Sequence, residues 1–203
     1  MQYLEALAAV GGLSKPSKMP GWSWSLSASE CDTGGKLRQI KGSTCSKCYA
    51  LRGNYRFDNV VDAQARRRAA LERPDFVENF VIVLTKLYAS GREDRFRWFD
   101  AGDLPNVETL QKIVEIARQT PHIRHWLPTR ELSIVRGLRD IPANLTIRLS
   151  AAMIGDTLTP FEGMTWSGVN VADIPQCPAP QQGNKCGSCS MCWGKEPVSY
   201  HLH

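Results

Sequence analysis

Apolar and polar residues follow two different periods along the chain. Residues 22–26, Trp-Ser-Trp-Ser-Leu, and residues 145–149, Leu-Thr-Ile-Arg-Leu, alternate with a period of two, which predicts β-strands. Apolar stretches at 96–99, 125–127 and 167–171 predict three more strands. Each of them is followed by polar or turn-forming residues, so the sequence predicts five or six short strands.

Helical periodicity occupies most of the intervening sequence. The clearest case is 76–88, where Phe76, Phe80, Leu84 and Tyr88 fall on one helical face. Further helices are predicted at 60–71, at 107–117 and, as a short turn, at 132–138. An apolar N-terminal stretch at 1–13 predicts a packed helix, because it carries Glu5 and lacks the basic start of an export signal. Residues 32–43 are rich in Gly, Lys and Thr and are expected to form a loop.

Strands that alternate with helices indicate an α/β fold with a parallel sheet. A closed eight-stranded barrel usually needs about 250 residues, and the chain has 203. We therefore expect a partial or small (β/α) barrel over residues 1–175. Residues 176–203 would form a cysteine-rich extension packed on it.

Polar side chains stand at or just after the ends of the predicted strands, where the chemistry of such barrels takes place. We choose Asp100, Asp103 and Arg148 as candidate catalytic residues. Arg148 would point into the barrel, where an unpaired charge is unfavourable, so it should meet a substrate anion or form an internal ion pair. Asp103 could instead cap the helix that begins near Asn106. The strand-end residues are Asp100, Asp103, Thr129, Arg130, Arg148, Ser150, Asn170 and Asp173.

The seven cysteines form two groups. Cys31, Cys45 and Cys48 form an N-terminal trio, and a quartet follows after a long stretch without cysteine, comprising Cys177, Cys186, Cys189 and Cys192. Two consecutive C-x2-C steps in the quartet are typical of iron–sulfur ligation, although C-x2-C also serves zinc. We expect all seven to bind metal, as one or two [4Fe–4S] clusters, with structural zinc as the alternative.

The trio and the turn after residues 96–99 resemble radical S-adenosylmethionine (SAM) enzymes. Cys45-Ser-Lys-Cys48-Tyr49-Ala50 is similar to the end of that family's cysteine motif, and Ala101-Gly102-Asp103 occupies the place of its Gly-Gly-Glu turn. The resemblance implies a cluster with one open iron, and a bound SAM or similar cofactor held by Gly102, Asp103, Arg130 and Ser150. Cys31 and Cys45 are farther apart than the first two cysteines of that motif.

Four segments together resemble an uncharacterised phage and plasmid family, the "gene product 88" type. They are Lys18 to Leu26, Cys48-Tyr-Ala, Phe99-Asp-Ala-Gly-Asp103 and Cys186 to Trp193. The resemblance implies an element-borne cytoplasmic protein with a bound cluster, and no established reaction.

Charge and histidines change this interpretation little. The net charge of +5 permits an anionic substrate or weak nucleic-acid contact, and the run Arg66–Arg68 is more typical of a solvated helix face. His122 and His125 are expected at the surface. We thus expect an iron–sulfur protein that acts as an enzyme on a small molecule, with no membrane segment. The alternatives are an electron-transfer or sensing protein and a zinc-stabilised module for nucleic acid or a partner.

Overall fold

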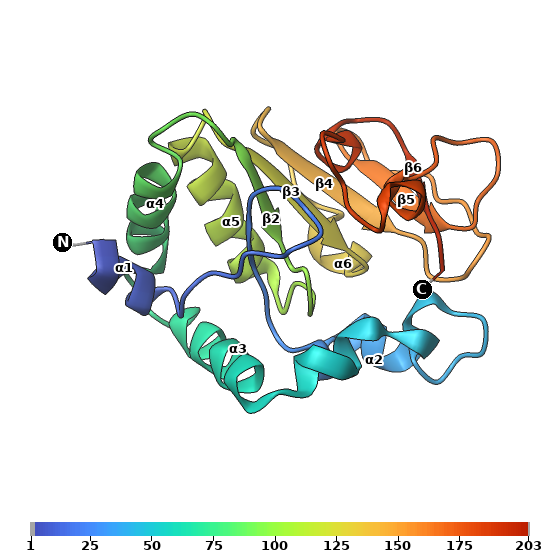
Figure 1. The fold of residues 1–203 in the computed structure, drawn as a ribbon, viewed down its shortest axis with the longest axis horizontal. Coiled ribbons are helices and arrows are strands. Elements are labelled where there is room, and N and C mark those ends of the chain that lie inside the picture. Colours follow the sequence, from blue (N-terminus) through green and yellow to red (C-terminus); the bar gives the residue numbers. More distant parts are fainter. Residues whose placement is uncertain (1–2, 203) are drawn as a thin grey trace.

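The computed structural model describes residues 3–202, which form one six-stranded parallel sheet with helices (Figure 1). The strands are β1 (Trp22–Trp24), β2 (Arg95–Trp98), β3 (Arg124–Thr129), β4 (Leu145–Ser150), β5 (Thr165–Val169) and β6 (Val198–Tyr200). The helices are α1 (Tyr3–Ala9), α2 (Asp32–Leu37), α3 (Asp58–Ala70), α4 (Phe76–Leu87), α5 (Val107–Gln119) and α6 (Leu132–Val135). The predicted α/β class is confirmed.

The strands lie side by side in the order in which they occur in the chain, and every neighbouring pair is parallel. Helices α1, α4, α5 and α6 pack one against the next, so they form a single layer over one face of the sheet (Figure 1). We call this the helix face, and the other the open face. The connection from β5 to β6 lies over the open face.

Alternation within the strands explains the two faces. Leu145, Ile147 and Leu149 of β4 are fully buried in the main apolar core on the helix face. Thr146 and Arg148 point to the opposite side, as expected for a period of two. Aromatic rings from β1, β2 and α4 fill the other end of the core, where Trp24 lies edge-on to Phe76, Phe80, Trp98 and Phe99.

Three local predictions need correction. Residues 32–43 are not a continuous loop, because α2 forms at Asp32–Leu37 in spite of its two glycines. The fifth strand begins at Thr165 rather than Ser167. The extension adds a strand of its own, β6, which pairs with β5.

Polar contacts also differ from two of the expectations. Asn106, not Asp103, caps α5, since its side chain accepts a hydrogen bond from the backbone N–H of Thr109 at 2.8 Å. Arg67 of the Arg66–Arg68 run is buried and donates to the Gly12 carbonyl and to the hydroxyls of Ser14 and Ser25. It therefore fixes the N-terminal segment on α3. No helix within residues 3–202 is long and apolar enough to cross a membrane.

His125 is fully buried, so the expectation of a surface position is wrong for it, whereas His122 is exposed. The Trp98 indole donates to His125 Nδ1 at 3.2 Å, and His125 Nε2 lies 2.9 Å from the Thr120 hydroxyl, which itself donates to the Ile116 carbonyl. His125 is therefore the neutral tautomer with its proton on Nε2. Burial, and secondarily the charge of His122, lower the pKa of His125 to about 3.

This neutral histidine should make stability fall in acid. Between about pH 3 and pH 6.5 the unfolded chain protonates His125 but the folded chain does not, so the free energy of unfolding decreases as the pH falls below 6.5, with a slope that approaches about 1.4 kcal/mol per pH unit. Urea unfolding of the wild type and of His125→Gln between pH 5 and pH 7 measures this slope. The difference between the two proteins isolates His125, because the other titrating groups are shared. Parallel curves would contradict it.

Candidate metal centre

The N-terminal trio is assembled beyond the carboxyl end of β1. The chain leaves β1, passes through the short helix η1 (Ala28–Glu30) and reaches Cys31 at the start of α2, while Cys45 lies on the short helix η2 (Thr44–Lys47) and Cys48 directly follows it. The sulfur atoms of Cys31 and Cys45 both lie within 3.7 Å of the point where a Cβ on Gly34 would stand. The structure thus brings the trio's segments together, although they are far apart in the sequence.

A small apolar cluster also joins this region to the sheet. Cys31 and Cys48 pack against Ala28, Ala50 and Ala101, which form a cluster separate from the main core. Ala101 belongs to the turn after β2, so the cysteines lie beside the segment expected to form a cofactor-binding turn.

Residues directly after β3 and β4 hold the cysteine segments in place. The Glu131 carboxylate accepts hydrogen bonds from the Thr33 backbone N–H at 2.9 Å and the Thr33 hydroxyl at 2.7 Å, so it caps the amino end of α2. This contact explains a helix with two glycines. The Thr44 N–H donates to the Ala152 carbonyl after β4, and Arg130 Nη2 donates to the Thr44 hydroxyl at 2.7 Å. Arg130 therefore lies beside Cys45.

Asp103 connects the ends of β2 and β3 next to the trio. Its carboxylate accepts hydrogen bonds from the Thr129 hydroxyl at 2.6 Å and from the backbone N–H groups of Arg130 and Leu104 at 2.8 Å each. Burial nevertheless raises the pKa of Asp103 to about 6, against the effect of these bonds. Three of its acceptor sites are occupied by the protein itself.

Gly102 allows the turn to approach the first strand. Its φ is +76°, and a Cβ there would stand 2.7 Å from the Leu26 carbonyl oxygen, which no side chain tolerates. The structure thus explains the glycine by backbone packing.

Asp100 lies three residues before Asp103 in the same segment after β2, and hydroxyl groups hold its side chain in place. The Ser23 hydroxyl donates to Asp100 Oδ1 at 2.8 Å, and the Tyr55 hydroxyl donates to Oδ2 at 3.2 Å. The hydroxyl of Tyr49, the residue after Cys48, donates to the Asp100 carbonyl at 2.6 Å.

Ser150 stands at the carboxyl end of β4, on the same face as Arg148 and in register with Ser167 of β5. The expected residues therefore share one edge of the sheet.

The quartet lies in the connection from β5 to β6. Cys177, Cys186, Cys189 and Cys192 line one pocket, together with Pro178, Ala179, Met191, Trp193 and Val198. The Cys189 backbone N–H donates to the Cys186 carbonyl at 2.9 Å, and Cys192 Sγ lies 3.2 Å from the Tyr200 hydroxyl. The four thiols therefore face a common space with mostly apolar walls.

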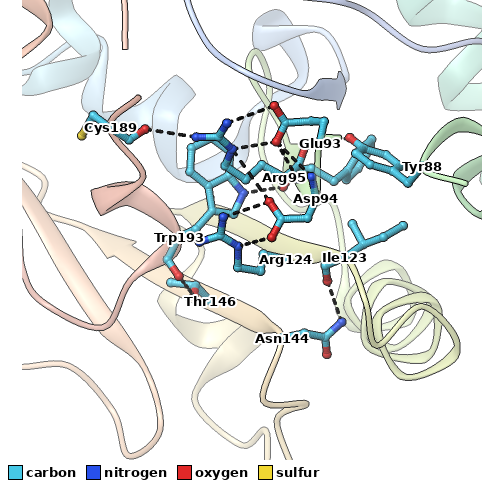
Figure 2. A network of polar contacts seen from close by, with 11 residues as sticks. Tyr88, Glu93, Asp94, Arg95, Ile123, Arg124, Asn144, Thr146, Cys189 and Trp193 are labelled. Carbon is cyan, nitrogen blue, oxygen red and sulfur yellow. Dashed lines mark hydrogen bonds and ion pairs between the residues drawn. The ribbon is translucent and has the colours of Figure 1, made fainter. Parts of the chain in front are cut away.

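Trp193 docks this connection on the open face of the sheet, as Figure 2 shows. Its indole N–H donates to the Phe96 carbonyl at 3.0 Å, and its own carbonyl accepts from the Thr146 hydroxyl at 2.8 Å. Arg95 Nη1 lies 3.5 Å from the Cys189 carbonyl. The quartet is thus seated over β2, β3 and β4.

Arg148 is fully buried below the quartet. Its Nη1 donates to the carbonyls of Trp166 and Glu196 at 2.7 and 2.9 Å, and its Nη2 to those of Gly194 and Met191 at 3.0 and 3.2 Å. These contacts indicate that it stabilises the C-terminal connection. None of the ion pairs within residues 3–202 includes Arg148, so the internal ion pair expected from the sequence is not formed, whereas its contact with a substrate anion stays a prediction.

The thiols are all free, and each is partly buried. Burial, followed by the charges of Asp103 and the other two trio cysteines, raises the pKa of Cys31 to about 12. Burial likewise raises the pKa of Cys45, against Arg130, and the pKa of Cys192 to about 11. A bound cation would reverse this preference, since metal binding releases thiol protons.

No group of three or more His, Cys, Asp or Glu side chains among residues 3–202 is arranged so that it could hold a metal ion.

Sequence reasoning assigned no role to three residues that organise the two cysteine groups, namely Glu131, Trp193 and Tyr200. Glu131 follows Arg130 directly and could have been included with the strand-end residues. Trp193 ends the last of the four segments that carry the family resemblance, but nothing in the sequence indicated its contact with the sheet, and Tyr200 carries no signal.

Comparisons with known proteins give one result. No curated protein and no solved structure matches the chain. The sequence model of the Gene product 88 family matches residues 4–184, which include the trio, the turn after β2 and Cys177, and end before Cys186. The chain belongs to the Gene product 88 family.

Proposed function

We propose that this chain is an iron–sulfur protein with two [4Fe–4S] clusters, and that the cluster on the trio serves an enzymatic site. The observation that carries the proposal is the separation of seven free thiols into three at the carboxyl edge of the sheet and four around one pocket. Four thiolates satisfy every iron of a cube, whereas three leave one iron for a further ligand. A reducing cytoplasm is the compartment in which such thiols stay free.

The donor chemistry fits a cube better than a single zinc ion. A tetrahedral zinc–thiolate site holds its sulfur atoms about 3.8 Å apart, given the usual Zn–S bond length. The described residues contain no group arranged to hold one ion. The ligands of a cube bind different iron atoms and need not converge on one ion, so this arrangement does not count against a cluster on either group.

The sheet supports a partial barrel of the radical-SAM type. Sequential strand order with the helices on one face is the winding of a (β/α) barrel, here without pairing between β1 and β6 within residues 3–202. The trio lies at the carboxyl edge, where such barrels carry their chemistry. An open iron there would supply a site at which a ligand is bound and activated.

The chain's own residues would bind and orient that ligand. Asp100, held by Ser23 and Tyr55, and Arg130 beside Cys45 provide charges of both signs at the edge. Asp103 has little capacity left for the amine of SAM, because its carboxylate already accepts three hydrogen bonds. We therefore favour an open-site cluster enzyme and treat SAM as a ligand to be tested.

Anaerobic purification with iron, sulfide and zinc measured per chain tests this function. We expect a brown protein with about eight iron and eight sulfide per chain, as two cubes require. Electron paramagnetic resonance of the reduced protein, with and without SAM, would show whether SAM reaches the open iron. A colourless protein with stoichiometric zinc would contradict the proposal and favour the zinc-stabilised binding module. Colour without response to any small ligand would favour electron transfer.

A further inference from the structure

Arg97 lies on the open face between the two cysteine groups. It is the third residue of β2, in register with Ser23 of β1 and Trp126 of β3. Its sequence neighbours Phe96 and Trp98 point into the core on the helix face, so its side chain points to the open face. Tyr49 and Asp100 from the trio's side, and Tyr200 and Cys192 from the quartet's side, are near enough to act electrostatically on its guanidinium.

The guanidinium of Arg97 has almost no hydrogen-bond partners. Its Nε is buried with no acceptor. Its Nη1 reaches only the Met19 sulfur, at 3.6 Å, and its Nη2 only the Phe99 carbonyl, at 3.5 Å, which is too long for a good hydrogen bond. None of the ion pairs formed within residues 3–202 includes Arg97. Arg97 is half-buried, and the part of its guanidinium that is removed from water lacks acceptors, which is unfavourable unless a ligand supplies them.

Neighbouring arginines on the sheet are satisfied by the protein. Arg95 bonds to both Glu93 carboxylate oxygens at 2.7 and 3.0 Å, and Arg124 bonds to both oxygens of Asp94 at 2.8 and 2.9 Å (Figure 2). The Nε of Arg148 also lacks a partner, but its two Nη groups donate hydrogen bonds to four backbone carbonyls. Arg97 is the exception among these four.

A second unpaired donor lies beside it. The Arg97 guanidinium carbon stands 4.4 Å from the centre of the Trp126 ring, a stacked position that holds the planar group in place. The indole N–H of Trp126 is itself buried with no acceptor. Two adjacent donors that lack acceptors indicate a ligand rich in acceptor oxygens.

We propose that Arg97 binds an anionic group, a carboxylate or a phosphate, with the Trp126 indole as a second donor. The planar fork of a guanidinium matches the two oxygens of either group. Calling the bound molecule the substrate rests on the proposed function, because Asp100 and Tyr49 connect Arg97 to the trio. The proposal of an anion site itself rests only on the hydrogen-bond donors of Arg97 and Trp126 that lack acceptors.

Isothermal titration of the purified cluster-containing chain with inorganic phosphate, and separately with acetate, tests the site. We expect saturable binding of one of the two, and this result identifies the kind of group. Arg97→Gln should weaken it about 10- to 100-fold, as loss of a charged hydrogen-bond donor does. Arg97→Lys, which keeps the charge and loses the fork, should lie between. Arg124→Gln, which removes a neighbouring but ion-paired arginine, should leave the affinity within about twofold.

Two results would overturn the inference: no saturable binding of either anion, or equal weakening in Arg97→Gln and Arg124→Gln. Iron measured on the same samples separates this inference from the proposed function. Full iron with an affinity unchanged in Arg97→Gln defeats the anion site alone. An iron-free wild type that still binds the anion through Arg97 defeats the cluster proposal alone.

Discussion

Replacing Arg148 with methionine is expected to destabilise the chain by about 3–5 kcal/mol, because it removes a buried charge that binds four carbonyls and leaves those carbonyls without donors. Three of the four belong to the connection that carries the quartet. The loss should therefore appear first in that connection and in β6, as faster amide hydrogen exchange than in β2–β4. Urea unfolding monitored by circular dichroism measures the global effect.

Arg124→Met is the matched control for this prediction. Arg124 lies on the neighbouring strand and pairs with Asp94 in a partly exposed position, so its removal should change the free energy of unfolding by less than about 1 kcal/mol. Arg148→Lys should give an intermediate loss, since a single ammonium reaches fewer carbonyls. Equal losses in Arg148→Met and Arg124→Met would show that the carbonyl contacts contribute little.

Removing one cysteine from each group should remove one cluster and spare the other. Cys45→Ala and Cys189→Ala are each expected to retain about four of eight iron atoms, because the groups lie on different parts of the sheet and each would hold its own cube. Iron and sulfide per chain after anaerobic purification measure this directly. Only Cys45→Ala should abolish spectral changes caused by small ligands.

Two exposed residues within the same motifs provide controls. Lys47 stands between Cys45 and Cys48, and Ser188 stands between Cys186 and Cys189. Lys47→Ala and Ser188→Ala should keep the full iron content. If either cysteine variant lost all its iron, the two groups would share a single cube. If Cys45→Ala kept all of it, Cys45 would not be a ligand.

Most of the sheet could be predicted because each central strand has a strong local pattern. Residues 145–149 alternate apolar and polar side chains, and the structure places β4 there, with Leu145 and Ile147 in the core. β6 lacked such a signal, since three residues with one serine carry no readable period. α2 was missed because its stability comes from Glu131, a residue almost a hundred positions away.

The candidate site was predictable as to its residue types but not as to the role of each arginine. Arg97 and Arg148 both stand on the polar side of a strand, yet the sequence led us to choose only Arg148 as a candidate. The difference comes from what covers them. The quartet's connection surrounds Arg148 with carbonyls and gives Arg97 none. Similarly, His125 could not be expected inside, because its burial depends on Trp98 and Thr120 from other elements.

The trio and its anchors also have a consequence for how the protein is made. Cys31, Cys45, Cys48 and the contacts that hold them, up to the strand-like pairing of Ser43 with Met153, all lie in the first three quarters of the chain. The quartet and β6 emerge later from the ribosome. The segments that carry the first cysteine group can therefore come together while the second group is still being synthesised.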